Sequence, residues 1–350
     1  MRAELDAAIG RVVSSGWYVL GPEHDAFQAE LADYLGVAHA VGVANGTDAL
    51  QLALAGLGVV AGDRVLTAAN AGGYTSTAVR ALGAEPVYAD VDESRLLLTV
   101  ETVSAAVEAM DADPRVIVVT HLFGAAADIQ SICVWAHARG IRVIEDCAQS
   151  LGARAGGVMA GSVADAATLS FYPTKNLGAL GDGGAVVTSD ESVAIAVREL
   201  RQYGWQSKYR ATRQGGRNSR LDELQAAVLR AKLPRLAGWN DRRRDIHRRY
   251  EDSASSGVRF VNTVGDHFVG HLAVVQVDDR DAARAVFARH GVTTDVHYPI
   301  PDHLQPVALG GSQVALPVTE RAAERILSLP LFPELTEAEI ERVCSAIAEV

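Results

Sequence analysis

The segments VIVVTHL (116–122) and IRVIED (141–146) decide the fold class of this chain. Both are short, continuous apolar runs rich in β-branched residues, which indicates strands that are buried on both faces of a parallel sheet. The stretch between them, Ile129–Ala138, has the spacing of an α-helix. A strand, a helix and a second strand in this order are typical of a βαβ unit.

The same alternation extends outward from this unit, from residue 39 to residue 190. Three more apolar runs predict strands, namely HAVGVA (39–44), RVLTAA (64–69) and EPVYADV (85–91). Helical spacing predicts helices at Thr47–Leu57 and Ser104–Met110. The pattern therefore predicts a doubly wound α/β domain.

After residue 190 the pattern changes to helices mixed with isolated strands. We expect helices at 191–203 and 219–250, a strand at Leu272–Val277, and further helices at 279–290 and 319–326. This mixture is typical of a smaller α+β domain. A length of 350 residues, at roughly 150 residues per domain, agrees with two domains. We predict a large domain over 1–235 and a small domain over 236–350.

The composition excludes several classes of protein. Apolar residues make up 49% and charged residues 21%, as in an ordinary globular protein. The formal net charge is -11, and an acidic chain is a poor nucleic-acid binder because phosphate neutralisation needs basic surface. We interpret the basic run RRRDIHRR (242–249) as a solvated helix face. Neither a signal peptide nor an apolar window of about 18 residues is found, so we expect a cytoplasmic protein without membrane contact.

The three cysteines, Cys133, Cys147 and Cys344, are too few for a disulfide scaffold, and their spacing matches no zinc site. We interpret them as reduced thiols in the core.

Candidate site residues follow the predicted strands, because ligands in open α/β sheets bind beyond the carboxyl ends of the strands. Asn45, Gly46 and Thr47 follow the first strand and form a helix start whose free N–H groups suit a phosphate. An ordinary capped helix is the alternative. Tyr74 follows the second strand behind two glycines, where it could stack on a flat ring or cap the edge of the core.

Two further candidates carry charge. Asp146 ends the fifth predicted strand, where a buried carboxylate is costly unless it meets a cation or hydrogen-bond donors. It could keep a ring nitrogen protonated or cap a helix. In SFYPTKNLGALGDGG (170–184), Lys175 lies in a glycine-rich loop, where a partly desolvated amine becomes a nucleophile toward an aldehyde. A surface hairpin with a solvated lysine is the alternative. Ser170 begins this segment, and its hydroxyl could reach a phosphate.

Together these segments supply what pyridoxal phosphate needs from a protein. They offer an amine for a Schiff base, a carboxylate for the pyridine nitrogen, a phosphate cup and an aromatic ring for stacking. No GxxxxGK[ST] phosphate loop is present, which weighs against a plain nucleotide-binding protein.

At this level of detail the chain resembles the DegT/DnrJ/EryC1/StrS sugar aminotransferases. The segments that carry the resemblance are ANGTDALQLAL (44–54), EDCAQSLGA (145–153), SFYPTKNLGALGDGGAVVT (170–188), NSRLDELQAAVLRAKL (218–233) and VHYPIPDHLQP (296–306). The resemblance implies a fold-type-I pyridoxal-phosphate transferase, with a large, mostly parallel sheet and a smaller C-terminal domain. It also implies a homodimer whose active sites are shared between the two subunits.

The resemblance also implies a role for each matching residue. Lys175 would form the Schiff base with the cofactor, Asp146 would pair with the pyridinium nitrogen, and Gln149 would bond the phenolic oxygen. The remaining cofactor contacts would be Tyr74 on the ring, Gly46, Thr47 and Ser170 on the phosphate, and Asn218 on the phosphate of the neighbouring subunit's cofactor. The expected substrate contacts are Tyr203, Lys208, Tyr209, Arg217, Arg220 and His297.

The implied reaction moves an amino group from an amino acid, expected to be L-glutamate, to a nucleotide-linked keto sugar by way of pyridoxamine phosphate. The segments YGWQSKY (203–209), NSRLDELQAA (218–227) and HYPIPDHLQP (297–306) resemble most the members that aminate C3 of a TDP-3-keto-6-deoxyhexose for antibiotic sugars. Amination at C4, amination of a cyclitol ketone, and a sugar dehydratase on the same fold are the alternatives. Because a related dehydratase branch replaces the lysine with histidine, Lys175 favours transamination. A non-catalytic protein that only holds the cofactor is disfavoured by Lys175, Asp146 and Gln149 together.

Overall fold

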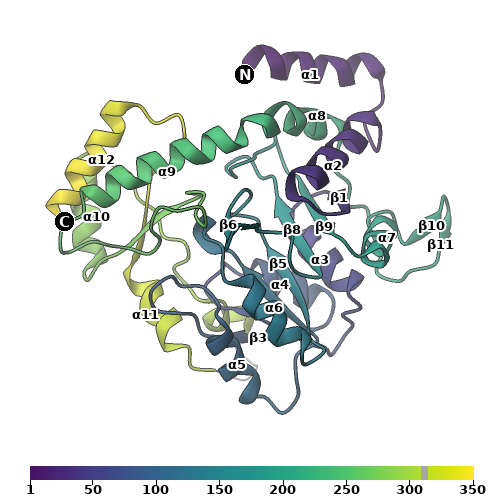
Figure 1. Ribbon diagram of the computed structural model, residues 1–350, viewed down its shortest axis with the longest axis horizontal. Helices are drawn as coiled ribbons and strands as arrows, with labels where there is room; N and C mark the ends of the chain where they lie inside the picture. Colours follow the sequence, from purple (N-terminus) through teal and green to yellow (C-terminus); the bar gives the residue numbers. More distant parts are fainter. Residues whose placement is uncertain (309–313) are drawn as a thin grey trace.

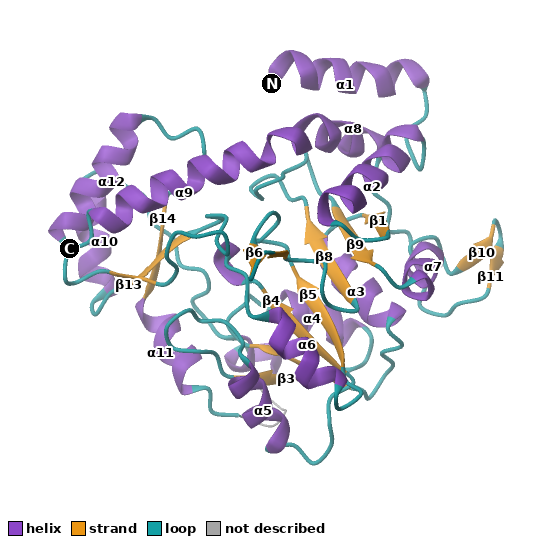
Figure 2. Cartoon of the chain, viewed as in Figure 1, coloured by secondary structure: helices purple, strands orange, loops and turns teal. Residues whose placement is uncertain are grey.

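The computed structural model describes residues 1–308 and 314–350 and contains a central sheet of seven strands (Figure 2). The strand order is β1-β9-β8-β5-β4-β2-β3. The strands are β1 (His39–Val43), β2 (Arg64–Ala68), β3 (Glu85–Ala89), β4 (Val116–Thr120), β5 (Arg142–Asp146), β8 (Ala166–Ser170) and β9 (Gly184–Thr188). Strand β9 pairs antiparallel with β1 and β8, and all the other pairs in this sheet are parallel. The predicted α/β fold class with a mostly parallel sheet is therefore confirmed.

Helices cover both faces of this sheet, as the alternation of side chains along β4 shows. Val116 and Val118 pack in the cluster formed with α3 (Gly46–Gly56), while Ile117 and Val119 pack in a second cluster on the opposite face. Helices α4 (Tyr74–Ala81) and α7 (Glu191–Leu200) join the first cluster, and α5 (Val100–Glu108) and α6 (Ile129–His137) join the second. A strand that is buried on both faces needs a continuous apolar run, which is what its sequence has.

The remaining helices of the N-terminal half are α1 (Arg2–Ser15), α2 (Pro22–Leu35) and α8 (Glu223–Lys232). Phe27 and Leu31 of α2 pack with Ala226 and Leu229 of α8 against the end of the sheet that carries β8 and β9. Helix α1 packs on α8 through Ala8 and Val12.

Two predicted helix boundaries are wrong for identifiable reasons. Helix α5 begins at Val100, four residues before the predicted start, because Thr99 and Thr102 form a reciprocal capping box there. The predicted helix over 219–250 is split into α8 and α9 (Leu236–Asp252). The turn between them contains Pro234, whose ring nitrogen has no hydrogen to continue the hydrogen-bond ladder of the helix.

A second, antiparallel sheet lies in the C-terminal part, with strands β12 (Arg259–Phe260), β13 (Ala273–Gln276) and β14 (Ile326–Leu329). It shares one apolar cluster with α9, α10 (Arg280–Arg289) and α12 (Glu337–Glu349), and Figure 1 shows α9 running from α8 to these helices. Helix α11 (Pro317–Arg325) precedes β14. The chain therefore contains a large sheet and a separate small sheet. The division into domains at residue 235 stays a prediction.

Smaller elements complete the described residues. They are the hairpins β6 (Arg154–Ala155) with β7 (Val158–Met159) and β10 (Trp205–Ser207) with β11 (Arg210–Ala211), and the 3₁₀ turns η1 (Leu122–Gly124), η2 (Leu233–Arg235), η3 (Asp302–Leu304) and η4 (Pro306–Ala308). The β10–β11 hairpin extends away from the body of the chain (Figure 1). Of the helices described, none is long and apolar enough to cross a membrane.

Candidate active site

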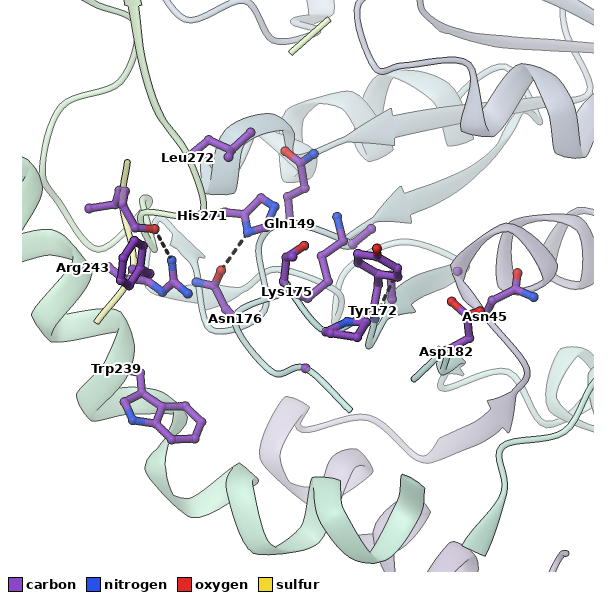
Figure 3. Close-up of a pocket in the computed structure, with 18 of the residues that line it drawn as sticks. Asn45, Gln149, Tyr172, Lys175, Asn176, Asp182, Trp239, Arg243, His271 and Leu272 are labelled. Atoms are coloured by element: carbon purple, nitrogen blue, oxygen red, sulfur yellow. Dashed lines mark hydrogen bonds between the residues drawn. The ribbon is translucent and has the colours of Figure 1, made fainter. Parts of the chain in front are cut away.

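A cavity of about 1110 Å³ opens at the carboxyl ends of the central strands. Asp146 is the last residue of β5, Ser170 is the last residue of β8, and Asn45 lies two residues after the end of β1. All three line the cavity, and part of its wall comes from α9 and the C-terminal segments (Figure 3). The chain thus brings its polar strand ends to one edge of the sheet, where ligands of open α/β folds bind.

One end of the cavity is a cup around the start of α3. The side chain of Asn45 caps this helix by accepting a hydrogen bond from the Asp48 backbone N–H at 2.8 Å. Gly46 lies against Ser170, because a Cβ atom at position 46 would be 2.8 Å from the Ser170 Cβ. Thr47 also lines the cavity. Free N–H groups at a helix start, with hydroxyls beside them, form a binding site suited to a phosphate.

Asp146 is 5% exposed, and among the described residues it forms no ion pair. Its carboxylate accepts hydrogen bonds from the Ala148 N–H at 3.1 Å and the Thr120 hydroxyl at 3.4 Å. Burial raises the pKa of Asp146 above its ordinary value, although Ala148 and the charge of Lys175 oppose this shift. A buried carboxylate without a cation fits the protonated ring nitrogen of a pyridine. The structure does not place it as a helix N-cap.

Lys175 lies in the loop after β8 and extends into the same cavity. The loop turns tightly, because a Cβ atom at Gly178 would be 2.4 Å from the carbonyl oxygen of Pro173. Burial lowers the pKa of Lys175, and the nearby Asp146 partly opposes that effect. A larger neutral fraction makes the amine a better nucleophile toward an aldehyde.

Gln149 has a fixed orientation in the cavity wall. Its Oε1 accepts a hydrogen bond from the Phe123 N–H at 2.6 Å, and its Nε2 donates to the Tyr298 hydroxyl at 3.2 Å. The second Nε2–H is left for a ligand, which suits the predicted contact with a phenolic oxygen. Tyr74 starts α4 and is half exposed, with its ring edge-on to that of Tyr298 at 6.1 Å between centroids.

An amide chain behind Lys175 was not predicted from the sequence. Asn240 donates to the Leu151 carbonyl at 3.0 Å and accepts from Asn176 at 2.8 Å, and Asn176 also donates to the Val269 carbonyl. Both Asn176 N–H groups are thus used, so its oxygen accepts a hydrogen bond from His271 Nδ1 at 2.9 Å. The remaining nitrogen of His271, Nε2, is unprotonated. Burial, with the charges of Lys175 and Arg243, holds the pKa of His271 well below its ordinary value.

Arg243 is a second cavity residue that was missed, because we interpreted its run as a solvated helix face. Arg242 and Arg249 are partly exposed and pair with Glu337, whereas Arg243 is buried in the cavity wall. The interpretation is therefore wrong for Arg243. The residues buried on α9 are Leu236, Asn240, Arg243, Ile246, His247 and Tyr250, a spacing of three to four that marks one helix face.

The structure brings only part of the predicted substrate set to this cavity. His297 lines it, with Nδ1 2.9 Å from the Ser328 hydroxyl. The predicted residues outside the cavity wall of the same chain are Tyr203, Lys208, Tyr209, Arg217, Asn218 and Arg220. Tyr203, Trp205 and Tyr209 stack along the protruding hairpin, with ring centroids 5.0 and 5.3 Å apart.

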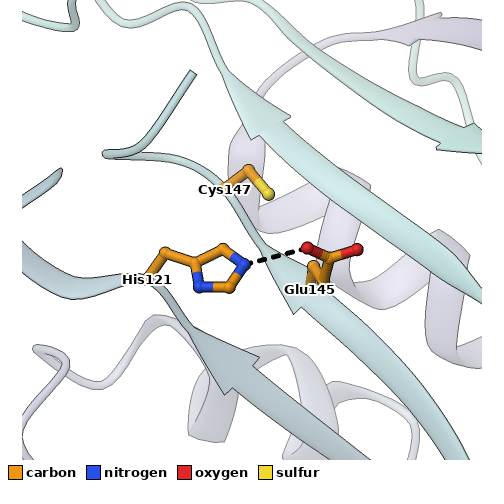
Figure 4. A group of neighbouring side chains, drawn as sticks. All are labelled: His121, Glu145 and Cys147. Carbon is orange, nitrogen blue, oxygen red and sulfur yellow. Dashed lines mark hydrogen bonds and ion pairs between the residues drawn. The ribbon is translucent and has the colours of Figure 1, made fainter. Parts of the chain in front are cut away.

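His121, Glu145 and Cys147 form a buried cluster of possible metal ligands (Figure 4). His121 Nδ1 accepts from the Ala127 N–H at 3.0 Å, so the opposite nitrogen carries a proton and donates to Glu145 at 2.9 Å. Burial raises the pKa of Cys147 well above its ordinary value, which keeps it a thiol. These ligand atoms are already engaged or protonated, and the cluster is structural. Cys133 is a buried free thiol as well, as predicted, whereas Cys344 is a free thiol that is only partly buried.

The residues present fit pyridoxal phosphate. The cup at Gly46 and Ser170 suits the phosphate, Asp146 suits the ring nitrogen, and Lys175 has an amine of lowered pKa in the same cavity. The fold and this set of residues define a pyridoxal-phosphate-dependent transferase.

Comparison with known proteins identifies the kind of transferase. The sequence matches the DegT/DnrJ/EryC1/StrS aminotransferase family over residues 1–348. It is 41% identical over 350 residues to the UDP-N-acetyl-3-dehydro-α-D-glucosamine 3-aminotransferase of Acidithiobacillus ferrooxidans, covering 99% of this chain and 94% of the relative. It is 42% identical over 358 residues to the dTDP-3-amino-3,4,6-trideoxy-α-D-glucose transaminase of Micromonospora megalomicea subsp. nigra, covering 100% and 95%.

Among solved structures, S. venezuelae DesV in complex with a ketimine intermediate superimposes with a TM-score of 0.94 at 42% identity, covering 99% of this chain and 94% of that one. The chain therefore belongs to the DegT/DnrJ/EryC1/StrS aminotransferase family, whose members use pyridoxal phosphate. The predicted family, enzyme class and cofactor are confirmed.

Proposed function

We propose that this enzyme transfers the amino group of an amino acid, L-glutamate in the first instance, to C3 of a TDP-3-keto-6-deoxyhexose. We further propose that the product enters deoxyaminosugar biosynthesis for an antibiotic. The observation that carries the proposal is the placement of Lys175 and Asp146 in one cavity beside the cup at Gly46 and Ser170. Of the two relatives described above, one is named as a 3-aminotransferase of a 3-dehydro sugar and the other for a 3-amino sugar, which favours C3 over C4.

The cofactor, when bound, supplies an electron sink and carries the amino group between the two substrates. Gly46, Thr47 and Ser170 hold its phosphate, and Asp146 keeps the proton on its ring nitrogen by charge pairing. Gln149 donates its free N–H to the phenolic oxygen. The Lys175 amine, whose pKa burial lowers, would take the proton from Cα of the amino donor in the first half of the reaction and would deliver a proton to C3 of the sugar in the second half.

We also propose that two chains form the working unit and that Asn218 contacts the cofactor phosphate of the other subunit. Asn218 is exposed and lies outside the cavity wall of its own chain. Tyr203 and Tyr209, at the β10–β11 hairpin, are also exposed and outside this wall, and the hairpin extends away from the body of the chain. An arm of this kind reaches a cavity only if the cavity belongs to another chain.

Subunit sharing is tested by mixing two inactive variants, Lys175→Ala and Asn218→Ala, after dissociation and reassociation. If the sites are shared, a mixed dimer contains one site with both native residues, and activity at limiting cofactor reappears. If Asn218 serves its own chain, each site in the mixed dimer lacks one residue, and mixing restores nothing.

The substrate is tested by incubation with L-glutamate and, in separate reactions, TDP-3-keto-6-deoxyhexose, TDP-4-keto-6-deoxyhexose, a UDP-linked 3-keto hexosamine and a cyclitol ketone. We expect 2-oxoglutarate and a 3-amino sugar nucleotide to form in equal amounts. Mass spectrometry measures both products. Product from the 4-keto sugar alone would refute the C3 assignment. Conversion of a sugar without consumption of glutamate would indicate a dehydratase.

A further inference from the structure

His271 is a buried residue of the cavity wall with one ring nitrogen left free. It is 7% exposed, and its Nδ1 is hydrogen-bonded to the Asn176 oxygen at 2.9 Å. Within the described residues nothing bonds to Nε2, and this atom is not sealed inside the protein. Nε2 is therefore open to the cavity, and Figure 3 shows the ring, Gln149 and Lys175 around that same cavity. A ligand can reach this nitrogen, and its protonation decides which group it binds.

Two backbone carbonyls determine which ring nitrogen carries the proton. A carbonyl oxygen only accepts, so Asn240 must present its nitrogen to the Leu151 carbonyl, 3.0 Å away, and its oxygen to Asn176. Asn176 likewise presents its nitrogen to Asn240, at 2.8 Å, and to the Val269 carbonyl, at 3.0 Å. Its oxygen is then left for His271 Nδ1, which has to donate. Neither amide can be reversed without losing these bonds, so the chain fixes the ring proton on Nδ1.

The surroundings of His271 keep its ring neutral. Burial, together with the charges of Lys175 and Arg243, holds the pKa of His271 well below its ordinary value. His297, which also lines the cavity, acts in the same direction. A neutral ring with its proton on Nδ1 has a lone pair on Nε2 and no hydrogen there. This nitrogen accepts a hydrogen bond from an O–H or N–H group and offers nothing to a carboxylate or a phosphate, which only accept.

The two substrates differ in what they can donate near the reacting carbon. Asn176 follows Lys175 in the chain and bonds to His271, and the charge of Lys175 acts on the ring, so the free nitrogen belongs to the part of the cavity that holds the reacting lysine. The amino donor brings an amine, which is the group that reacts, and carboxylates, which only accept. A keto sugar brings hydroxyl groups on the carbons next to its carbonyl, and each has a hydrogen to donate. The acceptor therefore suits the sugar better than the amino donor.

We propose that Nε2 of His271 accepts a hydrogen bond from the sugar hydroxyl next to the carbonyl that receives the amino group. The proposal rests on the aminotransferase function given above and adds a residue that selects the sugar. A buried acceptor left without its donor costs free energy, so a sugar that lacks this hydroxyl is rejected. Because the amino donor makes no use of this nitrogen, His271 acts in the sugar half of the reaction.

The test measures the binding of unreactive sugar nucleotides to the holoenzyme by calorimetry. TDP-6-deoxyglucose has no ketone, and its 2-fluoro and 4-fluoro analogues replace the hydroxyl on one or the other neighbour of C3 by an atom of similar size without a hydrogen. We expect the wild type to bind one of the two analogues about 3- to 10-fold more weakly than the parent, as for the loss of one neutral hydrogen bond. In His271→Phe this difference should disappear. The same set linked to UDP covers the second nucleotide named among the relatives.

His267→Phe is the matched control. His267 precedes His271 in the same loop, is only partly buried and lies outside the cavity wall, so this variant should keep the wild-type preference for the parent sugar. His271→Leu serves if His271→Phe does not fold or does not hold the cofactor, which chemical denaturation and absorbance show. Equal binding of the parent and both analogues by the wild type would overturn the proposal, as would a preference that survives in the His271 variants.

A second titration separates the two halves of the reaction. L-2-hydroxyglutarate keeps the carboxylates of glutamate without the amine, and it should bind equally to the wild type and the His271 variants. Weaker binding in these variants, with the sugar preference kept, would place His271 in the donor half and refute the proposal. If the wild type aminates no keto sugar but its preference for the parent disappears in His271→Phe, the proposed function fails and the hydroxyl site stands. Amination without any such preference would leave the proposed function intact and refute the role of His271.

Discussion

Glu145 and Asp146 are consecutive residues of β5, and both are buried, with 0% and 5% of the residue exposed. The surroundings of their carboxylates nevertheless differ. Glu145 accepts hydrogen bonds from His121 at 2.9 Å and from three backbone N–H groups of the turn 161–164. Burial alone would raise the pKa of Glu145, but these partners hold it below its ordinary value. Asp146 has weaker partners, and burial raises its pKa.

The two carboxylates point to opposite faces because side chains alternate along a strand. Glu145 faces the interior, where the chain itself supplies every partner it needs. Asp146 faces the cavity, where a bound ligand can supply the cation that pairs with its carboxylate. Burial is common to both, so the completeness of the hydrogen bonding separates a structural charge from one that awaits a ligand.

The largest expected effect follows from removing the residue that faces Asp146 across the cavity. Lys175→Ala should reduce turnover by roughly a thousandfold or more, because a nucleophile that also moves the proton is lost. The free energy of unfolding should change by less than about 0.5 kcal/mol, since the side-chain amine makes no hydrogen bond within the described residues. Steady-state kinetics and urea denaturation measure the two quantities. Normal turnover in the variant would disprove the assignment of Lys175.

Asp146→Asn should separate activity from stability. Loss of the charge that holds the ring proton should lower kcat by about 10²- to 10³-fold. The folded-state pKa of Asp146 is raised above its unfolded value, so the stability that its protonated form contributes is present at low pH and lost as pH rises through the folded pKa. At pH 7 the cofactor-free variant should therefore be more stable than the cofactor-free wild type. Urea denaturation of both at pH 7 checks this, and a less stable variant would contradict it.

Glu145→Gln should have the opposite pattern, with a large cost in stability. The amide has one acceptor oxygen for the four N–H donors that Glu145 satisfies, so buried donors are left unpaired at a cost of about 1–3 kcal/mol each at pH 7. The pKa of Glu145 is lowered on folding, so its contribution is present above the unfolded pKa and is lost as pH falls through the folded pKa. The difference from the wild type should shrink in acid. Equal destabilisation of Glu145→Gln at pH 7 and in strong acid, measured by urea denaturation, would count against this account.

The sequence alone predicts those parts of the fold and of the site that depend on local pattern. Five of the seven strands of the central sheet were predicted within two residues of each end, because each is a short apolar run, whereas the antiparallel strand β9 was not predicted. Lys175, Asp146, Ser170 and the start of α3 were found because a parallel sheet brings its strand ends together. These features depend on local pattern and on topology, both of which the sequence records directly.

Arg243 and His271 were missed because their roles depend on contacts made across long distances in the chain. Arg243 stands in a run of basic residues, and only its spacing from Asn240 and His247 indicates the buried side of α9. The state of His271 depends on Asn176, which is 95 residues away, and no local pattern indicates that pairing.

The smallest expected effect concerns that pairing. Asn176→Asp replaces the neutral acceptor beside His271 Nδ1 with a carboxylate, which resembles the environment that His121 has beside Glu145. A carboxylate favours the protonated ring, so the pKa of His271, now well below its ordinary value, should rise. NMR titration of the His271 ring protons measures this shift. Because a charged His271 would place a cation beside Lys175, the acidic limb of kcat/KM should move to higher pH in parallel.

Asn240→Asp is the matched control, since it alters the same amide chain one link further from the ring. Its carboxylate still accepts from Asn176 but leaves the Asn176 oxygen, and hence His271, neutral. A shift of the His271 pKa in both variants would show that the substitutions act on His271 by loosening the packing around it. A shift in Asn176→Asp alone would show that the neutral amide oxygen of Asn176 keeps His271 uncharged.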